Sequence, residues 1–133
     1  MQCGILAELM IEIVRLHHVS FAVRDVAASR RFFGDVLGIP EIDRPAFGFN
    51  GAWYALGDRQ LHLIEQADAS PEALAQLTRS DHMALEVKDM GTVRQALSDA
   101  NIEFQTGRNE HLGFAQTFCS DPDGHTIEFI TPD

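Results

Sequence analysis

Side chains that can bind a metal ion occur at matching positions in two similar segments of the chain. His18 begins the segment HVSFAVRDV, and His82 begins the related segment HMALEVKDM 64 residues later. In each segment an aspartate follows the histidine by seven residues. Neutral imidazole nitrogen is a good ligand for Fe, Ni, Mn, Co and Zn. The repeat therefore predicts two such nitrogens at equivalent places in the fold.

The alternation of apolar and polar residues predicts which way these histidines point. Val19 and Phe21 recur at every second position, so they share one face of a predicted strand. His18 and Ser20 then lie on the opposite face. The second segment alternates in the same way, which turns His82 away from the apolar face that packs on a helix.

The last predicted strand of each copy places one more possible ligand on that same face. His62 and Glu128 each lie between two apolar residues that we expect to face a helix. Under the repeat, His62 is equivalent to Glu128, as His18 is to His82. Three imidazoles and one carboxylate thus occupy two pairs of equivalent positions. A curved sheet made of both copies is predicted to gather them in one concavity.

Each copy of the repeat reads as one strand, one helix and three further strands. Asp25 and Asp89 are good N-caps for the two helices, and Gly38 and Asn101 mark their ends. The further strands are predicted at about 39–47, 51–56, 60–65, 102–106, 113–120 and 125–131. This order predicts an α+β fold of two tandem βαβββ modules, which form a curved mixed sheet with a concave metal-binding face.

The length of 133 residues suits a single domain. We expect an N-terminal extension over residues 1–13 and one domain over 14–133. Within that domain, module one covers 14–66, a linker covers 67–80, and module two covers 81–132. A short helix is predicted to begin in the linker at Ser70-Pro71-Glu72.

Charge and cysteine usage limit the partners and the compartment. The chain has 20 acidic and 10 basic residues, a formal net charge of −10. Such a charge repels nucleic-acid phosphates and anionic membrane surfaces, so we expect neither as a partner. Two cysteines cannot form a disulfide framework, and the first residues lack the pattern of a signal peptide. A cytoplasmic location is therefore expected.

Three motifs together resemble the vicinal oxygen chelate superfamily. They are the two His-led segments ending in Val-Arg-Asp and Val-Lys-Asp, the helix Ala28-Ser29-Arg30-Arg31-Phe32-Phe33 running into Leu37-Gly38, and the segment DPDGHTIE over residues 121–128. The resemblance covers about residues 14–132. That superfamily includes glyoxalase I, methylmalonyl-CoA epimerase, fosfomycin-resistance transferases, extradiol dioxygenases and metal-free bleomycin-binding proteins.

The resemblance implies a metal site. His18, His82 and Glu128 match ligand positions, and His62 matches the remaining one. Glyoxalase I usually has Glu at this last position and the epimerase has Gln, whereas dioxygenases and fosfomycin transferases offer no protein ligand there. His62 is therefore either a fourth ligand or a residue that lines the pocket. Either set implies one divalent ion per site, which is Ni, Zn, Mn, Co or Fe(II).

The number of ligands separates the functions that the resemblance implies. With four, the ion keeps room for two adjacent substrate oxygens, and Glu128 can also act as a general base. This set implies a divalent-metal-dependent isomerase or lyase that resembles glyoxalase I and acts on a small substrate. With three, two histidines and a carboxylate suit Fe(II), so an extradiol-type dioxygenase is an alternative. A metal-free small-molecule binding or resistance protein is the other alternative.

Further expectations concern the pocket and the assembly. Side chains that we expect to bind substrate are Ser20, Phe47, Trp53 and Phe118. Members of the superfamily are commonly homodimers with sites at or near the interface. The resemblance therefore also implies a homodimer.

Overall fold

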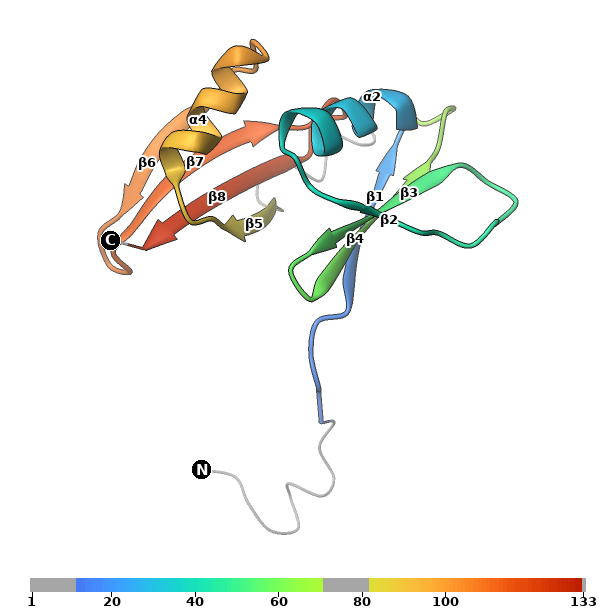
Figure 1. Cartoon of the computed structure of the whole chain (residues 1–133), viewed down its shortest axis with the longest axis horizontal. Helices are drawn as coiled ribbons and strands as arrows, with labels where there is room; N and C mark the ends of the chain where they lie inside the picture. The colour runs from blue at the N-terminus through green and yellow to red at the C-terminus, as the bar shows by residue number, and fades with distance from the viewer. Residues whose placement is uncertain (1–11, 71–81, 133) are drawn as a thin grey trace.

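A computed structural model describes residues 12–70 and 82–132, and its strands form two four-stranded sheets (Figure 1). The first sheet has the order β1-β4-β3-β2 and the second has the order β5-β8-β7-β6. The elements are β1 (His18–Val23), α2 (Val26–Arg30), η1 (Arg31–Val36), β2 (Glu41–Ile42), β3 (Gly51–Leu56), β4 (Arg59–Glu65), β5 (His82–Glu86), α4 (Met90–Asp99), β6 (Gln105–Asn109), β7 (Phe114–Ser120) and β8 (Thr126–Pro132).

The two sheets repeat the same pairing, as the sequence repeat predicts. β1 is parallel to β4 and β5 is parallel to β8, while the remaining pairs are antiparallel. Ser20 lies opposite His62 in the first sheet, and Ala84 lies opposite Glu128 in the second. Because these registers match, His62 and Glu128 occupy equivalent positions. The two-module α+β fold is confirmed with two four-stranded mixed sheets in place of one, and the concave metal-binding face stays a prediction.

Both helices begin where their capping residues predict. Asp25 accepts a hydrogen bond from the Ala27 amide at 3.0 Å, and Asp89 accepts one from the Gly91 amide at 3.1 Å. Each carboxylate satisfies an amide that has no partner within the first helical turn. At the other end of α4, Asn101 adopts the left-handed conformation with φ of 58°.

The first helix differs from the regular α-helix that its apolar spacing predicts. After α2 the chain continues as the π-helix η1, in which the Leu37 amide donates to the Phe32 carbonyl at 3.0 Å. Phe32 and Phe33 are adjacent in sequence and both are buried, with their rings edge to face at 4.9 Å. We attribute the wider turn to this packing, because it lets two neighbouring rings enter the core.

Two predicted strands have different bounds in the structure. The strand expected over 39–47 pairs only at Glu41–Ile42, and the chain then forms a loop that contains Pro45, which has no amide hydrogen to donate. The strand expected over 102–106 runs instead over Gln105–Asn109. Its start is delayed because the Ile102 amide still donates to the Leu97 carbonyl and so completes the end of α4.

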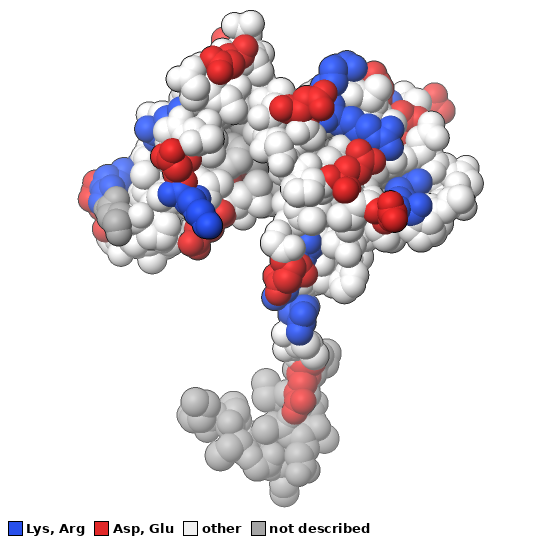
Figure 2. Space-filling model, viewed as in Figure 1, with Lys and Arg blue, Asp and Glu red and all other residues white. Residues whose placement is uncertain are grey.

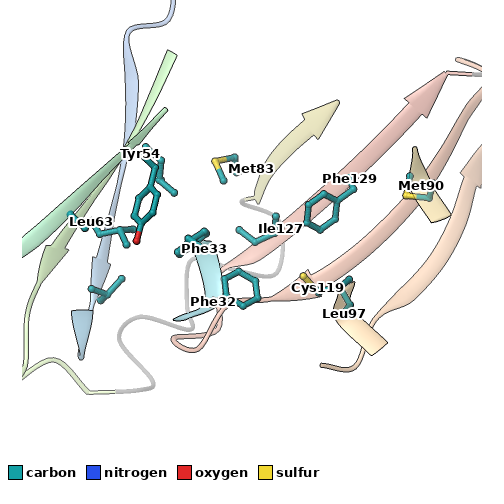
Figure 3. Close-up of a cluster of buried hydrophobic side chains, with 13 residues drawn as sticks. Phe32, Phe33, Tyr54, Leu63, Met83, Met90, Leu97, Cys119, Ile127 and Phe129 are labelled. Atoms are coloured by element: carbon teal, nitrogen blue, oxygen red, sulfur yellow. The ribbon is translucent and has the colours of Figure 1, made fainter. Parts of the chain in front are cut away.

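Buried side chains from both sheets form one hydrophobic cluster (Figure 3). Helix η1 contributes Phe32 and Phe33, and β8 contributes Ile127 and Phe129. Leu61 and Leu63 of β4 are fully buried, as their alternation with His62 predicts. The cluster occupies the helix side of each sheet, so the sheet faces that carry the candidate ligands lie on the other side.

Features outside the core bear on the remaining expectations. No helix within the described residues is long and apolar enough to cross a membrane. Acidic and basic side chains are interspersed over the face seen in Figure 2.

The predicted linker helix falls mostly in residues 71–81, outside the described residues, as does most of the predicted extension. The domain boundaries stay predictions.

Candidate metal-binding site

His82 and Glu128 form a close pair on neighbouring strands of the second sheet. His82 Nε2 lies 3.0 Å from Glu128 Oε1, and the Glu128 side chain is nine-tenths buried. The Gln116 side-chain amide donates to the other carboxylate oxygen, Oε2, at 2.9 Å. One oxygen of Glu128 is thus held by β7, while the other is directed at an imidazole nitrogen.

The spacing of this pair is that of a hydrogen-bonded imidazole and carboxylate, and it also suits two ligands of one metal ion. Two ligands at neighbouring positions of an octahedral ion, each about 2.1 Å from it, lie about 3 Å apart. The observed separation of 3.0 Å between His82 Nε2 and Glu128 Oε1 matches that spacing. Imidazole nitrogen and carboxylate oxygen are also the donor types that Mn, Fe, Ni, Co and Zn accept. The residues therefore fit a divalent ion.

The first sheet carries a column of stacked rings on the equivalent face. His62 stacks on Trp53 with ring centres 4.0 Å apart and an angle of 5° between the planes. His18 stacks with His62, also at 4.0 Å, with an angle of 16°. The two rings explain why His62 is only 8% exposed although it points away from the helix side. Gln60 Oε1 lies 2.8 Å from His62 Nε2 and fixes the ring further.

Stacking prevents His18 and His62 from binding the same metal ion. The lone pair of an imidazole nitrogen lies in the plane of its ring, and the planes of His18 and His62 are nearly parallel. A single ion cannot lie in both planes while the rings stay stacked. In this arrangement only one of the two, the exposed His18, is open to an ion.

The surroundings of His62 favour its neutral form. Burial is the first cause that lowers the pKa of His62, and the nearby positive charges of His18, His17 and Arg44 lower it further. A neutral imidazole does not repel an ion bound beside it. His17 belongs to the same group, because its Nδ1 lies 2.9 Å from that of His18.

The structure joins the four predicted ligands as two pairs. His18 meets His62, and His82 meets Glu128. Across residues 12–70 and 82–132, no three His, Cys, Asp or Glu side chains come together in a group that could hold a metal ion. The described residues of one chain therefore present the four candidate ligands as two separate pairs.

The residues expected to bind substrate lie beside these pairs. Ser20 is exposed and lies opposite His62, while Phe118 lies opposite Glu128 and is half-buried. Trp53 is part of the ring column, and Phe47 contacts it from the loop before β3 with ring centres 6.1 Å apart. All four therefore lie beside a candidate ligand or the ring column.

Sequence reasoning missed the two glutamines that hold the candidate ligands. Gln60 precedes His62 by two residues, and Gln116 precedes Phe118 by two. Same-face spacing along each strand was the available signal, because residues two apart share a face. Polar residues at such spacing are common on exposed faces, so the signal alone did not mark them.

Known proteins share the sequence pattern of this chain. Residues 15–129 match the family described as the Glyoxalase/Bleomycin resistance protein/Dioxygenase superfamily. The chain belongs to this superfamily. A relative called Glyoxylase I 4, from Arabidopsis thaliana, is 30% identical over 92% of this chain and 74% of its own length. Metallothiol transferase FosB of Staphylococcus saprophyticus is 26% identical over 87% of this chain and 76% of its own length.

Solved structures of superfamily members share the fold. A putative glyoxalase family protein from Bacillus anthracis has a TM-score of 0.79 at 23% identity, covering 93% of this chain and 99% of that one. Another is a mutant of the fosfomycin resistance protein FosX from Listeria monocytogenes, complexed with Mn(II) and 1S,2S-dihydroxypropylphosphonic acid. It has a TM-score of 0.76 at 14% identity, covering 92% of this chain and 95% of that one. At such identities the likeness concerns the fold.

Proposed function

We propose that this superfamily member is a divalent-metal-dependent enzyme that resembles glyoxalase I, with isomerase or lyase chemistry on a small substrate bound through two neighbouring oxygens. The observation that carries the proposal is the pair of His82 Nε2 and Glu128 Oε1 at 3.0 Å, with the carboxylate buried. A buried carboxylate that touches an imidazole is costly unless a proton or a cation lies with it. The names of its relatives, a glyoxylase and a metallothiol transferase, support the same class.

The complete site forms between two copies of the chain in this proposal. His82 and Glu128 of one copy supply two ligands, and His18 of a second copy supplies a third. A two-fold axis produces two such sites, because each copy presents both halves. The internal repeat favours this arrangement, since the two sheets present equivalent faces in the same register.

Each residue of the site has a separate task. A bound divalent ion would polarise substrate oxygens as a Lewis acid. Glu128 Oε1 accepts a proton from the substrate carbon, and Gln116 keeps the carboxylate in place by its bond to Oε2. Trp53 and His62 form an aromatic wall beside His18.

The stacked histidines favour a second candidate function. With His62 stacked on His18, both candidates share the ligands His18, His82 and Glu128, and this set of two histidines and one carboxylate also suits Fe(II) oxygenases. An Fe(II) extradiol-type dioxygenase is therefore the second candidate. The two candidates differ in the bound metal and in their need for oxygen.

Metal content per chain tests the proposal. The untagged protein is purified without oxygen and compared with His82→Ala and with His111→Ala, a control in which an exposed histidine at the β6–β7 turn is replaced. We expect about one Ni, Co, Mn or Zn per chain, lost in His82→Ala and kept in His111→Ala, and isomerase or lyase activity that follows the metal.

Two other outcomes decide between the alternatives. Stoichiometric iron, with activity on catechol-like substrates that consumes oxygen, replaces the first candidate by the second. Wild-type protein that binds none of these ions, even when each is added in turn, overturns both candidates and leaves a metal-free binding protein.

A further inference from the structure

Arg44 lies on the loop between β2 and β3, where its guanidinium group is held by aromatic rings. Its Cζ atom is 4.9 Å from the ring centre of Phe47 and 5.0 Å from that of Phe49. Its Nη2 donates to the Phe49 carbonyl at 3.0 Å. Gly51, the first residue of β3, leaves room for it, because a Cβ atom there would come within 3.0 Å of Arg44 Nε and Nη2. The loop therefore fixes the position of a half-buried cation.

A series of ring contacts connects this cation to His62 of the first sheet. Phe47 contacts Trp53, and Trp53 stacks on His62, so the rings form a continuous path from Arg44 to the histidine pair. Phe47 and Phe49 are stacked with ring centres 5.4 Å apart, yet they remain 45% and 48% exposed. Two large apolar rings on the surface beside a site offer a surface on which a flat ligand can pack.

The charge of Arg44 is not neutralised within the described chain. The ion pairs there join Arg24, Arg30, Arg59 and Arg108 to carboxylates, and none involves Arg44. A guanidinium group has five N–H donors, and stacking on aromatic faces leaves its edge available. The chain has a net charge of −10, so a cation held in place with no ion pair among the described residues is a suitable partner for an anionic ligand.

We propose that Arg44, Phe47 and Phe49 form a subsite that binds the carboxylate and the ring of an aromatic acid. The inference rests on the proposed function, since it assigns this subsite to the substrate of that metal centre. Arg44 binds the carboxylate through the edge of its guanidinium group, and the two phenylalanines pack against the ring. The substrate class is thus a small aromatic acid that also carries neighbouring oxygens for the ion.

The subsite is tested with benzoate as the probe and benzamide as its uncharged counterpart. Trp53 is the only tryptophan of the chain, so its fluorescence reports on ligands near Phe47. Titrations are made in EDTA, where no metal can bind the carboxylate, and then with added Mn²⁺. We expect a saturable change with benzoate and at least about tenfold weaker binding of benzamide.

Matched variants separate a binding role from a structural one. Arg44→Gln is expected to weaken benzoate binding at least about tenfold and to leave Mn²⁺ binding unchanged. Arg31→Gln removes the same charge from an exposed position of η1 and should bind benzoate like the wild type. Arg44→Lys, which keeps the charge without the planar fork, should bind benzoate with intermediate affinity and serves if Arg44→Gln does not fold.

The outcomes distinguish failure of the subsite from failure of the metal centre. Equal binding of benzoate and benzamide overturns the subsite, as does unchanged benzoate binding in Arg44→Gln or no saturable change in the wild type. If benzoate binds through Arg44 while the wild type binds no metal, the subsite stands and the proposed function falls.

Discussion

The orientation of the Glu128 carboxylate depends on Gln116, a neighbour to which the proposed function gives no contact with the substrate. Its Oε1 meets His82, and its Oε2 accepts the Gln116 amide proton at 2.9 Å. With Oε2 occupied in this way, the carboxylate keeps one orientation. Partners of this kind commonly change metal affinity by about 10–100-fold.

Replacing Gln116 by leucine should therefore weaken metal binding while the fold is retained. We expect the Kd for Mn²⁺, measured by isothermal titration calorimetry, to rise about 10–100-fold in Gln116→Leu. Gln95→Leu is the control, because Gln95 donates to Asp99 on the exposed side of α4. Wild-type affinity in Gln116→Leu would show that the glutamine does not position Glu128.

Cys119 is a buried thiol in the core cluster. Burial, and secondly the charge of Asp121, raises the pKa of Cys119 from 9.0 to about 11. Because the folded state keeps its proton while the unfolded chain ionises near pH 9, this residue's contribution to stability is complete below that pH. It is lost as the pH rises towards 11.

Thiol labelling measures the effect of burial on the reactivity of Cys119 directly. In a Cys3→Ser background, Cys119 should react with Ellman's reagent at pH 8 roughly 100-fold more slowly in the folded protein than in urea. The free energy of unfolding of the same variant should also fall more steeply above pH 9 than that of a Cys119→Ala variant. Equal labelling rates with and without urea would contradict the burial of this thiol.

At the scale of the element, the close pairing of β3 with β4 depends on Gly51, which has no side chain. A methyl group at Gly51 would overlap the carbonyl oxygen of Leu63 on β4 and approach Arg44. At Gly34 in η1, by contrast, the nearest atom would be Tyr54 Cε1 at 3.8 Å, an ordinary contact. The structure therefore requires glycine at position 51 and leaves room for a methyl group at position 34.

Gly51→Ala should destabilise the protein, and Gly34→Ala should not. We expect the free energy of unfolding, measured with urea, to fall by about 1–3 kcal/mol in Gly51→Ala, because the strand pair must separate to admit the methyl group. Gly34→Ala should stay within about 1 kcal/mol of the wild type. A reversed order would mean that the pairing of β3 with β4 is looser than the structure indicates.

Local sequence signals predicted most elements, and the exceptions have identifiable causes. Asp25 and Asp89 cap their helices as predicted because a cap depends on residues next to it in sequence. The π-helix depends on how Phe32 and Phe33 pack in the tertiary core, and the spacing of apolar residues does not encode this. The end of β2 depends likewise on the loop that Arg44 holds.

At the scale of the whole molecule, contacts between β1 with the residues after it and the turn before β8 join the two modules. Phe21 of β1 stacks on His125, with ring centres 4.4 Å apart, and Arg24 pairs with Asp123 at 3.0 Å. Asp121 in turn holds His125 Nδ1 at 2.9 Å. These contacts fix one module against the other while each presents a half of the proposed site.

Complementation between inactive variants tests whether sites are shared between copies. If His18 of one copy and His82 of another serve one ion, co-expressed His18→Ala and His82→Ala chains form mixed dimers with one intact site. Random pairing makes half of the dimers mixed, so metal content should recover to about a quarter of the wild type. Each variant alone should bind none, and the same result for the mixture would place all ligands within one chain.

The sequence by itself determined the repeat, the α+β fold class and the face on which each candidate ligand lies. These follow from local rules, because alternation along a strand fixes the side on which His18, His62, His82 and Glu128 emerge. Only the tertiary structure decided that they meet as two pairs, that His62 is stacked between Trp53 and His18, and that Arg44 lies at the end of this column. Such juxtapositions depend on how segments distant in sequence pack around the shared core, and the spacing of residues along the chain does not record that packing.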